Sequence, residues 1–110
     1  MATATYRAEG TRVDYTPDGA DVDAGAVIEF AAMIGIATQA IEAGDKGSLA
    51  ISGIFSMPKP TGDGGIDQGV VVYWDAGEVN ASATGSYLGK SAVTAEDGDT
   101  VVDVVINVNE

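Results

Sequence analysis

Short runs of β-forming residues, each soon ended by glycine, proline or aspartate, recur along the whole chain. The densest run is residues 66–75, which contains the only tryptophan, Trp74. Valine, tyrosine and tryptophan favour a pleated, half-buried surface, and the glycine and aspartate that flank this run are typical of turns. About seven such runs, with almost no helical pattern between them, predict an all-β fold, either a small single-domain β-barrel or a β-sandwich.

Two runs identify the core, because side chains alternate between the two faces of a strand. The run 70–75 is largely apolar on both faces, so we expect it to be a central strand that is covered on both sides. The run 100–108 has the most regular alternation and is expected to close the fold. The core residues that these two runs predict are Val70, Val72, Trp74, Val102, Val104 and Ile106.

Weaker runs supply the other expected strands, at residues 13–16, 26–30, 33–37, 48–56 and 86–93. Gly53 lies inside the run 48–56 and indicates a bulge or a close backbone approach. The glycine-rich residues 61–65 are expected to form an exposed loop. Residues 80–84 are polar and are expected to be a connection.

The composition excludes several classes of function. The chain has 110 residues, enough for one domain, and it contains neither cysteine nor histidine. Thiolate metal sites and the commonest general base are therefore absent, and no cofactor is expected. Five basic residues face 17 acidic ones, a net charge of -12, which disfavours nucleic acids and anionic membranes as partners. No apolar stretch approaches the roughly 20 residues of a membrane span. The N-terminus lacks an apolar signal region, so we expect synthesis in the cytoplasm.

Three patterns resemble chemical sites in part. Residues 44–48 lack the spacing and the following helix of a phosphate-binding loop. A carboxylate pair in a glycosidase needs an aromatic cleft, and few aromatic residues are available. Acidic residues gather in three turns without the spacing of a calcium-binding EF-hand loop, so solvated carboxylates are expected and a structural calcium site is the alternative. These acidic residues are Asp21, Asp23, Asp63, Asp67, Glu96, Asp97 and Asp99.

Residues 1–12 are small and polar, with threonine alternating with alanine and tyrosine at their start. This pattern favours an extended segment that buries little, so it is either a frayed terminus or an arm that becomes ordered on a partner. The segment contains Arg7 and Arg12, two of the five basic residues. On so acidic a chain, this is where we expect contact with an acidic partner surface.

A series of short motifs follows a specific order along nearly the whole chain. The motifs are Asp14-Tyr-Thr-Pro17, Val22-Asp-Ala-Gly25, Ile41-Glu-Ala-Gly44, Gly47-Ser-Leu-Ala50, Gly53-Ile-Phe-Ser-Met-Pro58, Gly69-Val-Val-Val-Tyr-Trp-Asp75, Leu88-Gly-Lys-Ser-Ala92 and Gly98-Asp-Thr-Val-Val-Asp-Val104. Each alone is ordinary turn-and-strand chemistry, but their order resembles the head decoration, or capsid cement, proteins of tailed bacteriophages. Some of those proteins carry a recombinase-like label, which the lack of a phosphate-binding loop here argues against.

The resemblance implies a structural protein of the virion that has no catalytic residues. Its expected organisation is an extended N-terminal arm, residues 1–12, followed by a β-rich decoration domain, residues 13–110. The resemblance further implies binding to the outer surface of the assembled head, bridging of major capsid proteins, and homotrimers at threefold and quasi-threefold positions.

Contact residues are expected in two places. The arm is the candidate for the capsid contact, through Ala2, Thr3, Ala4, Thr5, Tyr6, Arg7 and Arg12. The end of the run 48–56 and the loop after it are candidates for the trimer contact, through Met57, Pro58, Pro60 and Thr61. The alternative function is a non-catalytic binding module, such as a carbohydrate-binding β-sandwich on a virion or a larger complex, which would need a row of exposed aromatic residues. The lack of histidine and cysteine disfavours an enzyme.

Overall fold

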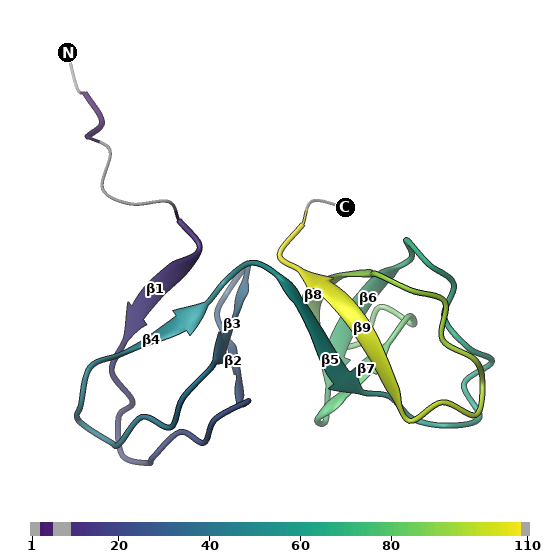
Figure 1. Ribbon diagram of the computed structural model, residues 1–110, viewed down its shortest axis with the longest axis horizontal. Helices are drawn as coiled ribbons and strands as arrows, with labels where there is room; N and C mark the ends of the chain where they lie inside the picture. Colours follow the sequence, from purple (N-terminus) through teal and green to yellow (C-terminus); the bar gives the residue numbers. More distant parts are fainter. Residues whose placement is uncertain (1–2, 6–9, 109–110) are drawn as a thin grey trace.

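The computed structural model describes residues 3–5 and 10–108, which form two antiparallel sheets (Figure 1). The first sheet has the order β1-β4-β3-β2. Its strands are β1 (Arg12–Tyr15), β2 (Val27–Glu29), β3 (Ile34–Ala37) and β4 (Gly47–Ala50). The second sheet has the order β5-β9-β8-β6-β7. Its strands are β5 (Ile54–Pro58), β6 (Val71–Asp75), β7 (Glu78–Asn80), β8 (Ser86–Ser91) and β9 (Val101–Ile106).

The prediction of an all-β fold is confirmed, since the described residues contain strands and turns and no helix. The architecture is two open sheets rather than a closed barrel. The second sheet nevertheless curls, so that its two outer strands, β5 and β7, approach each other. Across the described ranges, no helix is long and apolar enough to cross a membrane.

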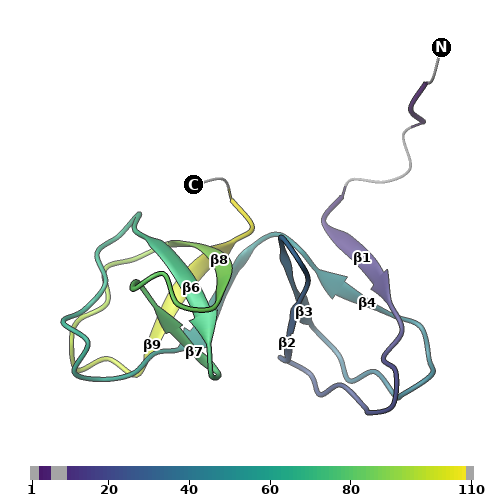
Figure 2. The same ribbon diagram turned by 180° about the vertical axis from the view of Figure 1, so that it is seen from behind.

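The run 48–56 forms two strands that belong to different sheets, not one strand with a bulge. β4 pairs with β1 and β3, whereas β5 pairs with β9. Residues 51–53 connect them, and the view from behind shows this connection passing from one sheet to the other (Figure 2). Gly53 has φ +122°, a conformation that a residue with a side chain rarely adopts, so the strand cannot continue straight through this point.

The strongest β-forming run lies nearer the edge of its sheet than expected. β8, not β6, is the middle strand of the five. β6 continues through a tight turn into β7, a strand that the sequence did not predict because Val79 is its only apolar residue. Ala76 and Gly77 in this turn both have positive φ, 52° and 81°, as a two-residue hairpin turn of the primed type requires.

The larger hydrophobic cluster contains most of the expected core. Val72, Val102, Val104 and Ile106 are at most 2% exposed, and Trp74 is partly buried and packs against the same cluster. Val70 instead lies on the surface, 37% exposed. Its N–H donates to the carbonyl of Asp67 at 3.3 Å, so Val70 closes the turn that precedes β6 and does not take a core position in the strand.

The third strand joins the two sheets, because it is buried on both faces. Ile34 and Ile36 pack into the larger cluster with residues of the second sheet. On the opposite face, Leu49 and Ala37 belong to a smaller cluster that Tyr15 and Phe30 partly cover. Gly35 makes this possible: a Cβ there would lie 2.8 Å from Cδ1 of Leu49, so only glycine lets Leu49 pack flat across the strand.

Candidate functional site

The N-terminal arm is described in part. Thr3, Ala4 and Thr5 are exposed, and this segment lies away from both sheets (Figures 1 and 2). Ala2, Tyr6 and Arg7 lie outside the described residues. Arg12, the last residue of the predicted arm, is also the first residue of β1. The main chain is still paired just before it, since the N–H of Ile51 donates to the carbonyl of Thr11 at 3.0 Å.

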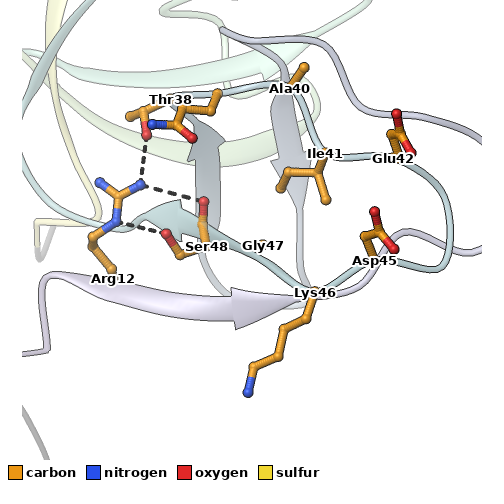
Figure 3. Close-up of a pocket in the computed structure, with 10 residues that line it drawn as sticks. Arg12, Thr38, Ala40, Ile41, Glu42, Asp45, Lys46, Gly47 and Ser48 are labelled. Atoms are coloured by element: carbon orange, nitrogen blue, oxygen red, sulfur yellow. Dashed lines mark hydrogen bonds between the residues drawn. The ribbon is translucent and has the colours of Figure 1, made fainter.

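Arg12 fixes the base of the arm to the first sheet. Its Nε donates to Oγ of Ser48 at 3.0 Å, and its Nη2 donates to Oγ1 of Thr38 at 2.6 Å and to the carbonyl of Ser48 at 3.4 Å (Figure 3). One guanidinium therefore links β1 to β4 and to the turn after β3. These bonds use Nε and Nη2, and Arg12 as a whole remains exposed.

An open groove of about 530 Å³ lies beside this guanidinium, lined by Arg12 and by residues 38–42 and 45–48. Glu42 and Asp45 lie on the side of the groove opposite Arg12 (Figure 3). The Lys46 side chain points away from it (Figure 3) and pairs with Asp14 at 3.2 Å. The groove thus offers hydrogen-bond donors on one side and carboxylates on the other, an arrangement that can hold the polar main chain of an extended segment.

The loop after β5 is exposed at its tip, and the buried side chain of Lys59 anchors it to the rest of the fold. The side chain of Lys59 is 0% exposed. Its Nζ donates to Oδ1 of Asp63 at 2.8 Å and to the carbonyls of Pro60 at 2.9 Å and Asp99 at 3.3 Å. This role of Lys59 was not among the predictions from the sequence. The available signal was a lysine held between two prolines with an aspartate four residues later.

Aspartates also connect this loop to the turn at 96–99. Asp97 Oδ1 accepts from the N–H of Gly64 at 2.6 Å, and Asp63 Oδ1 accepts from the N–H of Gly65 at 2.9 Å. Asp99 Oδ2 accepts from the N–H of Glu96 at 2.9 Å. These carboxylates therefore act as acceptors for main-chain donors within the turns. Among the described residues, no group of three or more acidic side chains is placed to hold a metal ion.

The pKa of Asp63 reflects two opposing effects. Burial raises the pKa of this carboxyl, and it is the largest single effect. The hydrogen bond from Lys59, the N–H of Gly65 and the charge of Lys59 together outweigh it, so the pKa lies below its ordinary value of 3.8. The carboxylate form of Asp63 is therefore the form that the folded loop favours.

The four predicted trimer-contact residues lie at different depths. Pro58 and Thr61 are exposed, and Pro60 is half-buried. Met57 is 2% exposed and belongs to the larger hydrophobic cluster. Met57 faces inward because it lies opposite Val102 in the β5–β9 ladder, and opposed residues in an antiparallel pair share a face.

The fold is all-β, and its surface features include the exposed segment 3–5, a polar groove beside Arg12 and a loop that the buried Lys59 anchors. The chain belongs to the phage cement protein family, whose model matches residues 8–106. That family is structural, and its members are associated with the phage capsid, which places this protein in the virion. Neither the curated proteins nor the solved structures include a significant match to this chain.

Proposed function

We propose that this protein binds the outer surface of the assembled phage head and stabilises it by bridging neighbouring major capsid proteins. The observation that carries the proposal is the family match over residues 8–106. The exposed segment 3–5 and the fixed base of the arm at Arg12 support it. Together they give a rigid body with one extension that can reach a neighbouring molecule.

Stabilisation by such a protein follows from linkage. A protein that binds the assembled shell more tightly than it binds free subunits shifts the equilibrium toward the shell. Linked copies increase this effect, because the second contact forms at a high effective concentration. We propose that this protein acts as a homotrimer at threefold and quasi-threefold positions, where a closed head-to-tail ring can form.

The arm is the proposed capsid contact, through the residues at positions 2–7 together with Arg12. A short segment rich in alanine and threonine can add a strand to an exposed sheet edge, since such pairing relies on main-chain hydrogen bonds and accepts small side chains. The groove beside Arg12 then receives polar groups of the capsid protein close to the base of the arm. Arg7 and the exposed Arg12 supply positive charge toward capsid carboxylates in this proposal.

The test is to delete residues 2–11 and measure binding to capsids by co-sedimentation. A variant in which these residues are replaced by a glycine–serine segment of equal length controls for reach. We expect both variants to fold and both to lose most of their capsid occupancy. Unchanged occupancy of the deletion variant would refute the arm as the contact, and failure of the unaltered protein to bind capsids would refute the proposed function.

The carbohydrate-binding alternative requires exposed aromatic side chains in a row. Every aromatic residue within the described ranges is only half-exposed or less. Tyr15 packs edge-on against Phe30, and Tyr73 packs edge-on against Tyr87, each with ring centroids 6.0 Å apart. Because these rings pack against each other within the protein, they do not form an exposed row for a carbohydrate. This favours the structural function.

A further inference from the structure

Three aspartates of this chain are followed directly by glycine, and such pairs are open to a specific self-modification. The pairs are Asp18-Gly19, Asp63-Gly64 and Asp97-Gly98. Glycine has no Cβ, so its main-chain nitrogen can reach the side-chain carboxyl carbon of the preceding aspartate. The ring that forms, a succinimide, opens with water to give either aspartate or isoaspartate. Every residue of the three pairs is exposed, so exposure alone does not distinguish them.

Hydrogen bonds hold both reacting groups of the second pair. Asp63 Oδ1 accepts from Lys59 Nζ at 2.8 Å and from the N–H of Gly65 at 2.9 Å. The N–H of Gly64, whose nitrogen would have to attack, donates instead to Oδ1 of Asp97 at 2.6 Å. Ring closure has to break these bonds first, so this pair is expected to react slowly.

The third pair is held at its aspartate. Asp97 Oδ1 is the acceptor for Gly64, and the main-chain carbonyl of Asp97 accepts from the N–H of Gly62 at 3.1 Å. The turn around this pair is closed by Asp99, whose N–H donates to the carbonyl of Glu96 at 3.1 Å. These contacts fix the Asp97 carboxyl group against the neighbouring loop, so its ring closure requires the loop and the turn to separate.

The first pair has none of these restraints. Within the part of the chain that the structure describes, no hydrogen bond or ion pair holds the Asp18 carboxyl group or the N–H of Gly19. Gly19 has φ +90°, and a Cβ built on it would meet nothing within 4 Å. Residues 18–20 therefore form an exposed turn in which the two reacting groups have no other partner.

We propose that Asp18 is the site at which this protein converts spontaneously to isoaspartate. After the carboxylate takes up a proton, the nitrogen of Gly19 bonds to Cγ of Asp18, and the carboxyl hydroxyl leaves with the N–H hydrogen as one water. A second water then opens the ring at the main-chain carbonyl carbon of Asp18. Gly19 stays joined through Cγ, so the main chain gains one carbon and the former main-chain carbonyl becomes a free carboxylate. One water leaves and one enters, so the mass is unchanged.

The isomerised turn would lie between two fixed points. The carbonyl of Pro17 accepts from the N–H of Gly44 at 2.9 Å, and Oδ1 of Asp21 accepts from the N–H of Ala43 at 2.9 Å. A longer main chain between Pro17 and Asp21 strains both bonds. The same segment contains Glu42, which lines the groove described above. We therefore expect isomerisation to speed amide hydrogen exchange at Ala43 and Gly44.

The experiment incubates the folded chain at neutral pH and physiological temperature, and locates isoaspartate in its peptides by electron-transfer fragmentation, which distinguishes the two isomers. The same incubation in urea gives the rate for each pair without folded contacts, so the ratio of the two rates cancels local sequence. We expect Asp18 to react at nearly its unfolded rate. Asp63 and Asp97 should be slowed at least about fivefold, since breaking one net hydrogen bond corresponds to roughly that factor. Equal slowing at all three positions, or slowing at Asp18 alone, would overturn the proposal.

Two variants test the cause. Asp18→Glu keeps the charge but requires a larger ring, so it should remove the product at this position and abolish the faster exchange at Ala43 and Gly44 in aged protein. Asp97→Ala frees the N–H of Gly64 and should raise the folded rate at Asp63. Aged Asp18→Glu that exchanges like the aged unaltered chain, or an unchanged rate at Asp63, would contradict the assignment. Capsid binding is not a readout here, so the inference stands or fails separately from the proposed function.

Discussion

The side chain of Asn107 pairs with both main-chain groups of Ile34. Its Oδ1 accepts from the N–H of Ile34 at 2.9 Å, and its Nδ2 donates to the carbonyl of Ile34 at 2.8 Å. Nδ2 also donates to the carbonyl of Ile51 at 2.8 Å. Asn107 follows the last strand of the second sheet, whereas Ile34 begins β3 of the first. The side-chain amide of Asn107 therefore links the end of the second sheet to the first residue of β3 in the first sheet.

Replacing Asn107 should therefore weaken the junction of the two sheets. Asn107 has φ +58°, so Asn107→Gly keeps the backbone conformation while removing the side chain. We expect a loss of about 2–3 kcal/mol in the free energy of unfolding, because main-chain groups of the buried Ile34 lose their partners. Urea denaturation measures it. Asn107→Ala should lose a further ~1 kcal/mol from the positive φ. Equal stability of Asn107→Gly and the unaltered chain would contradict this role.

Removing the buried lysine should cost more than removing an exposed one. Lys59→Met keeps the apolar stem but leaves Asp63 and two carbonyls without the ammonium, which we expect to cost about 2 kcal/mol or more. Lys46→Met is the matched control, because Lys46 and Asp14 are each 71% exposed and an exposed pair contributes less than about 1 kcal/mol. Thermal and urea unfolding of both variants give the comparison. Similar losses in the two variants would argue against the anchoring role of Lys59.

The stability of the loop should depend on pH in the acidic range. The folded pKa of Asp63 lies below its ordinary value of 3.8, so the unfolded chain takes up its proton first as the pH falls. The contribution of Asp63 to stability is therefore complete above that ordinary value and is lost as the pH falls through the lower folded pKa. Unfolding of the unaltered chain and of Asp63→Asn should differ at neutral pH and converge in acid. A constant difference across this range would contradict the assignment.

Two glycines with nearly the same positive φ should differ in their tolerance of alanine. Gly69 and Gly85 have φ +86° and +91°, but a Cβ at Gly69 meets nothing within 4 Å, whereas one at Gly85 would lie 2.1 Å from the carbonyl oxygen of Trp74. Gly69→Ala should cost about 1 kcal/mol from the dihedral alone. Gly85→Ala should cost at least ~2 kcal/mol more, because the β6–β8 backbone must move. Urea midpoints measure the difference, and equal costs would show that the close approach is relieved without strain.

Alternation in the sequence predicted the last strand correctly but could not locate the passage between sheets. Val102, Val104 and Ile106 are buried because a regular strand places every second residue on one face. The run 48–56 also reads as one strand, yet its halves pair with strands that lie far from each other in the chain. The strand pairing of each half depends on those distant strands and on the backbone conformation of Gly53. The local hydrophobic pattern carries no information about either.

The candidate site was predictable only where it is local. The lack of apolar periodicity in residues 1–12 predicts an arm, and the structure describes residues 3–5 and 10–12 of this segment. The groove at its base brings Arg12 beside Thr38 and Ser48, which are 26 and 36 positions away in the chain, so it exists only after the first sheet has formed. The burial of Lys59 depends likewise on Asp99, 40 positions away. Contacts of this kind follow from topology rather than from spacing in the sequence.

The antiparallel pairing of β1 with β4 determines how the molecule would respond to a mechanical load. Arg12 lies opposite Ala50, so the arm leaves the ladder at the same end where the chain departs toward β5. A pull on the arm that the second sheet resists would open this ladder like a zipper, one hydrogen bond after another, instead of shearing all of them at once. The hydrogen bond from Ile51 to Thr11 would break first at that end. The Arg12 guanidinium, bonded to Ser48 and Thr38, would have to release next, so it adds to the force at which the arm would separate.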